Sequence, residues 1–494
     1  MSSTQPTLLT NFIGNTFRDS EGGKFIDSIN PGTGKVHARI PDSTEKDVEL
    51  AVEAAEKAFP FWSSKTTKER AEYMRRIAIL LEERLEEFAQ AESRDQGKSI
   101  SFARAVDIPR AIYNFRFFAE KSVALTKAPD EDYGVFQEGN STARVIRQPV
   151  GVAGLISPWN LPLYLLSWKM APAIAYGCTC VCKPSEFTSL TAWMFCQVLV
   201  DAHLPPGVIN MVFGRGATAG NALAVHPKVP LISFTGGTLT GETITKACAP
   251  HVKKLSLELG GKNPALILQG ANVDKAVEVT LRSSFTNQGE VCLCTSRILV
   301  HRSLYPKVLE GLVKGANAYR VGPPGDKDTQ MGALVSKEHL DKVDGFVKEV
   351  RATRGEKAIL CGGHTITTVP GHEEGYFYAP TVIAGVDQTD RIWKDEVFGP
   401  VIIVVPFDTE EEGITLANDT KYGLCATVLT EDAEEARRVS RSLQCGTVWV
   451  NCWLVRLLDF PFGGFKASGV GREGGRDSRD FFTEPVTIIS PFEA

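Results

Sequence analysis

Residues 150–157 read VGVAGLIS, and they open a run of short apolar segments that decides the fold. CTCVCKP (178–184), VINMVFG (208–214), LISFTG (231–236) and KLSLELG (254–260) follow, separated by stretches of helical length. Strands that are buried on both faces have continuous apolar sequences, so this pattern predicts a parallel sheet with crossover helices.

A second series of the same kind follows along the chain. Its members are PALILQ (264–269), RILVHR (297–302), VIIVVPF (401–407), CATVLT (425–430) and GTVWVN (446–451), again with helical stretches between them. We therefore expect an α/β fold of two units in sequence, preceded by a helical region. TEPVTIISP (483–491) has strand character outside both series, so we expect it to pair away from the main domains, with a partner subunit as one option.

Caps and periodicity predict the helical region. We expect one helix over about residues 45–58 and a longer one that opens at the capping box Thr66-x-x-Glu69 and stops near Gly97. The longer helix turns one apolar face toward the core, made of Met74, Ile77, Leu81, Leu85 and Phe88. A third helix is expected over about residues 101–121. The GTGK stretch lacks the full spacing of a phosphate loop, and we interpret it as a turn.

The bulk composition argues against several classes of function. The length of 494 residues favours two or three domains, and the net charge of -5 gives no electrostatic footprint for nucleic acid or a membrane surface. Lys169 and two prolines interrupt the apolar stretch 161–182, so we expect a buried helix that runs into a strand. The 11 cysteines form no C-x-x-C pair and no zinc-type spacing with histidine, so no metal is expected. The N-terminus resembles no secretory signal, and we expect reduced thiols in a cytoplasmic protein.

Two segments carry residues that suit covalent catalysis. Cys292 lies in FTNQGEVCLCTSR (285–297), among turn-forming residues that present a thiol to a cleft, where backbone N–H groups lower the thiol pKa. Glu258 ends the apolar strand of LSLELGGKNP (255–264), and burial there raises the pKa of a carboxylate, as suits a general base. Each segment alone has an ordinary alternative, namely a structural cysteine in a loop and a salt-bridged glutamate near a turn.

Together the two segments resemble the aldehyde dehydrogenase superfamily, whose signatures are glutamate in E-L-G-G-K and cysteine in F-x-N-x-G-(Q/E)-x-C. The resemblance extends from about residue 11 to 487 and includes SPWNLPL, KPSEFT, FTGGTLTG, EVFGPV and PFGGFKASGVGRE in family order. It implies a Rossmann-like NAD-binding domain (1–127 and 149–257) and an α/β catalytic domain (258–475). It also implies an oligomerisation segment (128–148 and 476–494) that builds a homodimer or homotetramer.

The resemblance implies NAD-dependent oxidation of an aldehyde to a carboxylic acid. In that reaction Cys292 attacks the aldehyde to give a thiohemiacetal, and Asn160 with the Cys292 backbone N–H holds the developing alkoxide. Glu258 activates the water that hydrolyses the resulting thioester, and it also helps to deprotonate Cys292. Cys294 stands where the family usually has a small residue; we interpret it as a packing residue, with a resolving thiol as the alternative.

The same resemblance assigns a site for NAD. Lys183 and Glu186 hold the adenosine ribose, and the carboxylate repels a 2′-phosphate, which favours NAD over NADP. Gly236 and Gly241 open a helix toward the pyrophosphate, with Gly237 where serine is commoner. The other expected cofactor contacts are Ile156, Ser157, Pro158, Trp159, Gly216, Phe234, Thr235, Leu259, Glu396 and Phe398.

Two further stretches reach the substrate by their family positions, DIPRAIYNFRFFAE (107–120) and NCWLVRLLDFPFGG (451–464). Arg110 and Arg456 favour an aldehyde with a distal carboxylate, although an ion pair within the protein is the alternative for each arginine. Trp453 and Phe460 are expected beside them.

The chain most resembles the branch of the family that oxidises 2-aminomuconate or 2-hydroxymuconate semialdehyde, acidic products of tryptophan or aromatic-ring breakdown. An apolar aldehyde such as retinal, or a broad range of aldehydes, is the alternative substrate. An inactive structural or binding protein on the same fold is the alternative of another class.

Overall fold

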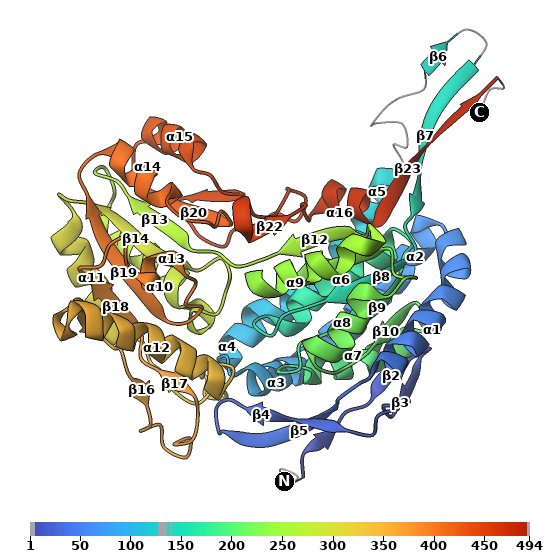
Figure 1. Ribbon diagram of the computed structural model, residues 1–494, viewed down its shortest axis with the longest axis horizontal. Helices are drawn as coiled ribbons and strands as arrows, with labels where there is room; N and C mark the ends of the chain where they lie inside the picture. The colour runs from blue at the N-terminus through green and yellow to red at the C-terminus, as the bar shows by residue number, and fades with distance from the viewer. Residues whose placement is uncertain (1–4, 127–135, 139–140, 492–494) are drawn as a thin grey trace.

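The computed structural model describes residues 5–126, 136–138 and 141–491, and two large sheets dominate it (Figure 1). The first is eight-stranded, with the order β22 (Gly469–Val470), β12 (Lys254–Glu258), β11 (Leu231–Thr235), β8 (Val152–Ile156), β9 (Thr179–Lys183), β10 (Ile209–Met211), β2 (Asn11–Ile13) and β3 (Thr16–Arg18). The strands from β12 to β10 run parallel, as the first apolar series predicts. β22 and β2 join this parallel core antiparallel, one on each side.

Helices cover both faces of the first sheet. One face packs on α2 (Thr67–Glu83), α3 (Leu85–Gln96), α5 (Ile108–Thr126), α6 (Pro162–Ala175) and α7 (Leu190–Asp201). The other face packs on α1 (Glu45–Ser64), α8 (Asn221–Val225) and α9 (Thr238–Cys248). Strand β9 shows the alternation directly, because Cys180 and Cys182 enter the first core and Val181 enters the second. The apolar stretch 161–182 is therefore a buried helix that leads into a buried strand.

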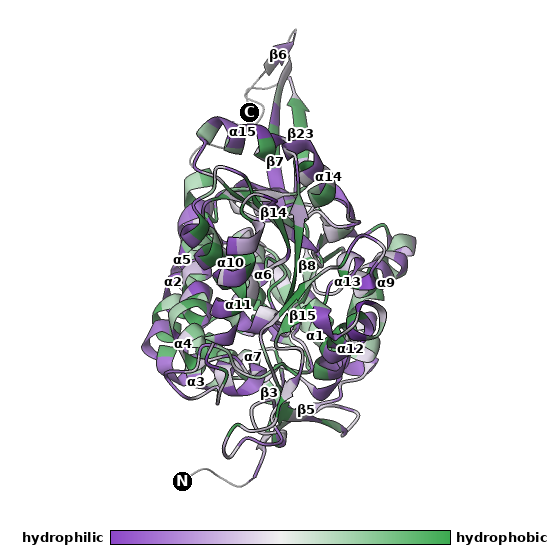
Figure 2. Ribbon diagram, turned by 90° about the vertical axis from the view of Figure 1, so that its left-hand side faces the viewer, coloured by the Kyte–Doolittle hydropathy of each residue, from purple (hydrophilic) through white to green (hydrophobic). Residues whose placement is uncertain are grey.

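The second sheet is seven-stranded and contains the whole second apolar series. Its order is β15 (Ile359–Cys361), β18 (Thr381–Ala384), β19 (Val401–Phe407), β14 (Thr295–His301), β13 (Asn263–Ile267), β20 (Cys425–Leu429) and β21 (Thr447–Val450). The helices on its faces are α10 (Val273–Phe285), α11 (Tyr305–Asn317), α12 (Lys337–Arg354), α13 (Arg391–Lys394), α14 (Glu410–Asn418) and α15 (Ala433–Ser442). Figure 2 shows apolar colour on interior strands such as β8 and β14 and polar stretches on outer helices such as α15.

The two sheets meet where the chain passes from β12 to β13. Only residues 259–262 separate these strands, so Glu258 at the end of β12 lies at the junction. The short β22 returns from the C-terminal half of the chain to pair with β12 and places Gly469 opposite Glu258. The structure therefore closes the junction with segments that are about 200 residues apart in sequence.

Two small sheets lie outside this body. β23 (Thr483–Ser490), β7 (Ser141–Pro149) and β6 (Phe136–Glu138) form an antiparallel ribbon that projects at the upper right of Figure 1. TEPVTIISP thus pairs outside the main sheets, with β7 of its own chain. The expected oligomerisation segment includes this ribbon and α16 (Gly475–Phe482), while its residues 128–135, 139–140 and 492–494 lie outside the described residues. Near the N-terminus, β4 (Phe25–Asn30) and β5 (Lys35–Pro41) pair across the GTGK turn, and β1 (Thr7–Leu8) joins β5.

The helical region departs from its prediction at three places. The first helix continues past residue 58 to Ser64, because buried Trp62 packs in the core and donates its indole N–H to Ile174 O at 3.0 Å. The helix capped by Thr66 breaks at Arg84 (φ −104°, ψ 15°), and its continuation ends at Gly97 with φ +93°. The third helix is divided into α4 (Ile100–Phe102), a π-helical turn (Ala103–Asp107) and α5. Within the described residues, no helix is long and apolar enough to cross a membrane.

Candidate active site

Cys292 lies in a tightly turned segment that follows helix α10. Asn287, Gln288 and Gly289 adopt positive φ values of 51°, 57° and 72°, so the chain turns sharply before it enters β14. The Cys292 side chain is partly exposed, and its carbonyl accepts a hydrogen bond from Asn263 Nδ2 at 2.6 Å. Burial, followed by the charges of Glu396 and Glu258, raises the pKa of the Cys292 thiol to about 12. This corrects the expectation of a lowered pKa, since desolvation outweighs the backbone N–H groups.

Glu258 is a buried carboxylate without a hydrogen-bonding partner. The strand-end position predicted for it is confirmed, and its exposed fraction is 4%. Neither carboxylate oxygen forms a hydrogen bond within the described part of the chain. Burial and the nearby charge of Glu473 raise the pKa of Glu258 well above its usual value, as expected for a general base.

The thiol lies between two cavities. One cavity is lined by Cys292, Glu258 and Arg456. Its other lining residues are mostly apolar: Phe102, Val106, Leu161, Tyr164, Leu165, Trp168, Thr235, Val291, Leu293, Leu454, Phe462 and Glu473. The second cavity joins Cys292 to Glu396 and Phe398. Cys292 therefore lines both cavities.

Asn160 lies just before helix α6 and is held against the Cys292 segment. Its Nδ2 donates to Glu290 O at 2.9 Å, and its side chain is buried. A primary amide nitrogen carries two hydrogens, so this contact leaves one of them for another acceptor.

The carboxyl ends of β8, β9, β11 and β12 meet at one edge of the first sheet, which is where α/β sheets bind ligands. Lys183 Nζ is 3.1 Å from Glu186 Oε2, and Gly216 N donates to Glu186 Oε1 at 3.1 Å. Burial opposes ionisation of Glu186, but Lys183 and the Gly216 N–H outweigh it and hold the pKa of Glu186 below its usual value. The Gly214-x-Gly216 stretch forms the turn that follows β10.

The same edge has the free polar groups that a dinucleotide needs. Ser157 Oγ and Thr235 Oγ1 are buried without a hydrogen-bonding partner among the described residues. The N-cap of helix α9 is Gly237, which provides no side-chain cap, and a side chain on Gly237 would meet no atom within 4 Å. Its first N–H groups are available to a phosphate. These features fit a bound dinucleotide.

The other expected cofactor residues surround this edge. Ile156 and Phe234 are paired on neighbouring strands and buried, and Pro158 follows β8 with partial exposure. Leu259 packs so closely on Gly241 that an added Cβ would lie 2.6 Å from Cδ2 of the leucine, which explains why glycine is needed within α9.

Glu396 and Phe398 face the second cavity. Glu396 Oε1 accepts from Gly261 N at 3.0 Å. Phe398 has a positive φ of 60°, which costs free energy for a bulky residue and suggests a functional constraint. Its ring packs edge-on against Trp159 with centroids 5.2 Å apart.

Both predicted arginines contact Tyr164. Arg456 Nη1 donates to Tyr164 Oη at 3.3 Å, and the Arg456 guanidinium carbon lies 3.7 Å from the centroid of the Phe462 ring. The guanidinium of Arg110 lies over the Tyr164 ring at 5.5 Å. Neither arginine forms an ion pair within the described residues, and Arg456 Nη2 and Arg110 Nε are buried without a hydrogen-bonding partner there. Among the described residues, neither Arg110 nor Arg456 therefore forms the internal salt bridge that was the alternative for each.

Trp453 and Phe460 do not line the cavity that contains Glu258 and Arg456. Trp453 is buried behind the Cys292 segment and donates its indole N–H to Leu293 O at 2.9 Å. Phe460 is 64% exposed, and Phe462 two residues further on lines the cavity instead. Cys294 is buried and its thiol contacts Thr286 O, as the packing interpretation expects.

The sequence interpretation missed a buried ion pair beside Glu258. Glu473 Oε1 is 3.1 Å from Lys169 Nζ, and Glu473 Oε2 accepts from the indole N–H of Trp168. The signal was the lysine itself, because a charge in an apolar helix needs a buried partner. Tyr164 was also missed; nothing in the sequence distinguishes it from the apolar residues around it.

Comparison with known proteins agrees with this geometry. The family model described as "Aldehyde dehydrogenase family" matches residues 17–488. The chain is 53% identical to the 2-aminomuconic semialdehyde dehydrogenase of Mus musculus, with 97% of this chain and 98% of that protein covered. It is 40% identical to the 2-hydroxymuconic semialdehyde dehydrogenase of Pseudomonas sp. (strain CF600), with 97% and 99% covered. A structure of a Bacillus cereus aldehyde dehydrogenase in complex with NAD+ is similar, with 37% identity, a TM-score of 0.92, and 98% and 96% covered.

Proposed function

Because the chain belongs to the aldehyde dehydrogenase family, we propose that it oxidises a muconate-type semialdehyde to the carboxylic acid with NAD. The substrates in question are 2-aminomuconate 6-semialdehyde and 2-hydroxymuconate semialdehyde, after which the relatives are named. One observation carries the choice of an acidic aldehyde. Arg456 lines the same cavity as Cys292 and Glu258, and its Nη2 has no hydrogen-bonding partner among the described residues, so it can bind a carboxylate at the far end of the aldehyde.

The protein's residues divide the work as follows. The Cys292 thiol loses its proton to the Glu258 carboxylate and its sulfur attacks the aldehyde carbon to form a thiohemiacetal. The remaining amide hydrogen of Asn160, together with the Cys292 backbone N–H, stabilises the alkoxide. After oxidation has produced a thioester, Glu258 releases to solvent the proton that it took from Cys292. It then takes a proton from water, the hydroxide attacks the thioester carbon, and the thiolate leaves. The raised pKa of Glu258 suits both proton transfers.

The dinucleotide site supports NAD as the cofactor. Lys183 and Glu186 would hold the adenosine ribose, the first turn of α9 the pyrophosphate, and Glu396 with Phe398 the nicotinamide end. When bound there, the nicotinamide supplies the acceptor for the hydride of the thiohemiacetal. The Glu186 carboxylate disfavours the additional phosphate of NADP.

A screen for NADH production tests the proposal. 2-Hydroxymuconate semialdehyde, retinal, betaine aldehyde and hexanal are compared by kcat/KM, with Cys292→Ala as the control. We expect the semialdehyde to be preferred, and the Cys292→Ala variant to bind NAD but to produce no NADH. A preference for retinal would favour the alternative that the apolar lining supports, with Leu161, Trp168 and Phe462 as the contacts. NAD binding without NADH from any aldehyde would indicate an inactive binding protein.

We further propose a homodimer or homotetramer that assembles through residues 128–148 and 476–494, and a role in tryptophan or aromatic-ring breakdown in the cytoplasm. The projecting ribbon of β7 and β23 supports assembly, since β23 lies at the edge of its sheet, where a strand of another chain can be added. The free state of all 11 cysteines suits a reducing compartment. Light scattering of the full chain and of a variant that lacks residues 483–494 tests the assembly. The domain limits 1–127 with 149–257, and 258–475, remain a prediction that limited proteolysis checks.

A further inference from the structure

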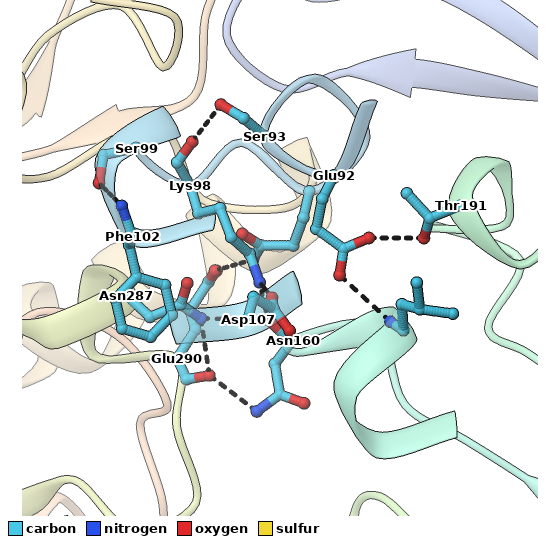
Figure 3. A network of polar contacts seen from close by, with 12 residues as sticks. Glu92, Ser93, Lys98, Ser99, Phe102, Asp107, Asn160, Thr191, Asn287 and Glu290 are labelled. Atoms are coloured by element: carbon cyan, nitrogen blue, oxygen red, sulfur yellow. Dashed lines mark hydrogen bonds and ion pairs between the residues drawn. The ribbon is translucent and has the colours of Figure 1, made fainter. Parts of the chain in front are cut away.

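A cluster of buried charges lies behind Asn160 and takes no part in the chemistry described above. Glu92, Lys98 and Asp107 are each 0% exposed, and all three belong to the segment that leads from α3 to α5. Lys98 Nζ forms an ion pair with Asp107 and donates to Asn160 O at 2.9 Å (Figure 3). A buried ion pair contributes little net stability compared with apolar residues of the same size. Its presence here therefore calls for a reason other than stability.

Asn160 is held at both of its ends. Its main-chain carbonyl accepts from Lys98 Nζ and also from Asn287 Nδ2 at 3.1 Å. Its side-chain amide donates to Glu290 O at 2.9 Å. Figure 3 shows Lys98 and Asn287 reaching the carbonyl while the amide extends to Glu290. The lysine thus fixes the backbone from which the amide projects.

The segment that carries Lys98 also holds the nucleophile's loop. Gln96 Nε2 donates to Glu290 Oε2 at 2.7 Å, and Glu290 is two residues before Cys292. Residues 96–98 therefore contact the amide donor through Lys98 and the Cys292 segment through Gln96.

We propose that Lys98 is a positioning residue that acts through Asn160, and that its buried pairing with Asp107 preorganises the amide for the alkoxide on Cys292. The inference rests on the proposed function. An oxyanion donor contributes to catalysis only when it is already at the place where the charge develops. The lysine touches neither substrate nor cofactor in this proposal; its effect is limited to what Asn160 contributes.

Because Lys98 acts only through Asn160, the contribution of Asn160 to kcat sets the largest effect that a change at Lys98 can have. Removal of one oxyanion donor costs about 10²- to 10³-fold in kcat, which bounds the loss from any residue that acts through Asn160. Loss of a supporting contact typically costs about 10- to 100-fold. Lys98→Met alone leaves Asp107 buried without its partner, which lowers stability. The pair Lys98→Met with Asp107→Leu removes both charges and keeps the fold.

The test is a double-mutant cycle on the full-length protein. NADH formation is followed with 2-hydroxymuconate semialdehyde and with hexanal in the wild type, Asn160→Ala, Lys98→Met/Asp107→Leu and the combined variant. The single variant Lys98→Met is measured as well, at a temperature below its midpoint of thermal unfolding, so that the folded protein is assayed. Arg70→Met is the matched control, since Arg70 is also a buried cation that donates to a backbone carbonyl, Ala175 O at 3.0 Å in the helix α6 that follows Asn160. That carbonyl is at the opposite end of α6, roughly 20 Å from Asn160.

We expect Lys98→Met/Asp107→Leu to lower kcat about 10- to 100-fold with little change in KM or NAD affinity. In the Asn160→Ala background the same pair of substitutions should change kcat less than about threefold, because the side-chain amide through which Lys98 acts has already been removed. Arg70→Met should lower the thermal midpoint without this coupling. An equal loss in both backgrounds, or an unchanged kcat in the wild-type background, overturns the inference. Wild-type inactivity, or an Asn160→Ala variant with full activity, would instead contradict the proposed function.

Discussion

Replacing Arg456 by Met removes the guanidinium from the cavity and keeps a side chain of similar length. The structure gives this change two consequences. A carboxylate at the far end of the substrate loses its partner, since Arg456 Nη2 has none within the described protein. Glu258 also loses a nearby positive charge that lowers its pKa, so its pKa rises further.

The first consequence is specific to acidic aldehydes. A hydrogen bond to a charged group contributes about 1.5–3 kcal/mol, and the partly exposed position of Arg456 places it toward the lower end. At about 1.4 kcal/mol per factor of ten, kcat/KM for 2-hydroxymuconate semialdehyde should fall roughly tenfold. The loss should appear mainly in KM.

The second consequence applies to every aldehyde. A higher pKa leaves less of Glu258 ionised at neutral pH, so deprotonation of Cys292 and hydrolysis of the thioester both slow, equally for acidic and apolar substrates. The ratio of kcat/KM for 2-hydroxymuconate semialdehyde to that for hexanal cancels this common effect. Raising the pH restores the ionised base and hence the hexanal rate, but it does not restore the semialdehyde preference.

The assay is therefore NADH formation with both aldehydes from pH 6 to 9 in the wild type and Arg456→Met. Tyr164→Phe is the matched control, because it removes the hydroxyl that Arg456 contacts and keeps both the ring and the arginine. We expect it to change the ratio less than Arg456→Met does. If the ratio in Arg456→Met stayed within twofold of the wild-type ratio at every pH, the carboxylate role of Arg456 would be refuted.

Three carboxylates, two of them buried, give further predictions. Glu258→Gln should release at most one equivalent of NADH and then turn over about 10²- to 10⁴-fold more slowly. It should also lose the rise in kcat that the wild type shows as pH increases through the raised pKa of Glu258. Rapid mixing and steady-state rates check both effects, and an undiminished steady rate would contradict the role of Glu258. Burial raises the pKa of Glu290 to about 8. A carboxyl whose pKa is raised on folding stabilises the fold when protonated, so stability is lost as pH rises toward 8, by up to about 1.4 kcal/mol per pH unit. Urea unfolding should show a flatter pH dependence for Glu290→Gln, and parallel curves would show the assignment to be wrong. Glu186→Gln should raise kcat/KM with NADP relative to NAD about tenfold, since the carboxylate that repels the 2′-phosphate is gone; measurement with both cofactors decides.

The parts of the fold that the sequence predicts are those with one dominant local cause. The parallel strands follow from continuous apolar runs, and the Thr66 cap and the Gly97 stop follow from side-chain and backbone chemistry within a few residues. The break at Arg84 and the extension of α1 to Ser64 were not predictable in this way, because packing against distant segments decides them. Trp62 is an example, since its partner Ile174 is 112 residues away.

The same distinction between local and distant causes applies to the residues of the candidate site. Cys292, Glu258 and Asn160 are recognisable because their motifs carry the chemistry. Whether burial or hydrogen bonding sets the pKa of Cys292 depends on how deeply the folded chain covers the thiol, so the sequence pointed in the wrong direction. Phe460 is exposed whereas Phe462 lines the cavity. The path of the loop decides which of the two phenylalanines faces the cavity, and residue type alone does not specify that path.

The pairing of β22 with β12 also sets the order in which the protein becomes an enzyme during its synthesis. Residues up to β12 emerge from the ribosome early, and chains generally begin to fold from the N-terminal side. The edge beside Glu258 nevertheless stays open until Gly469 arrives, and Lys169 lacks its ion-pair partner until Glu473 does. A nascent chain in which the dinucleotide-binding edge of the first sheet has formed therefore still lacks the complete surroundings of Glu258. Cys292 and a completed Glu258 site are therefore present together only after nearly the whole polypeptide has been made.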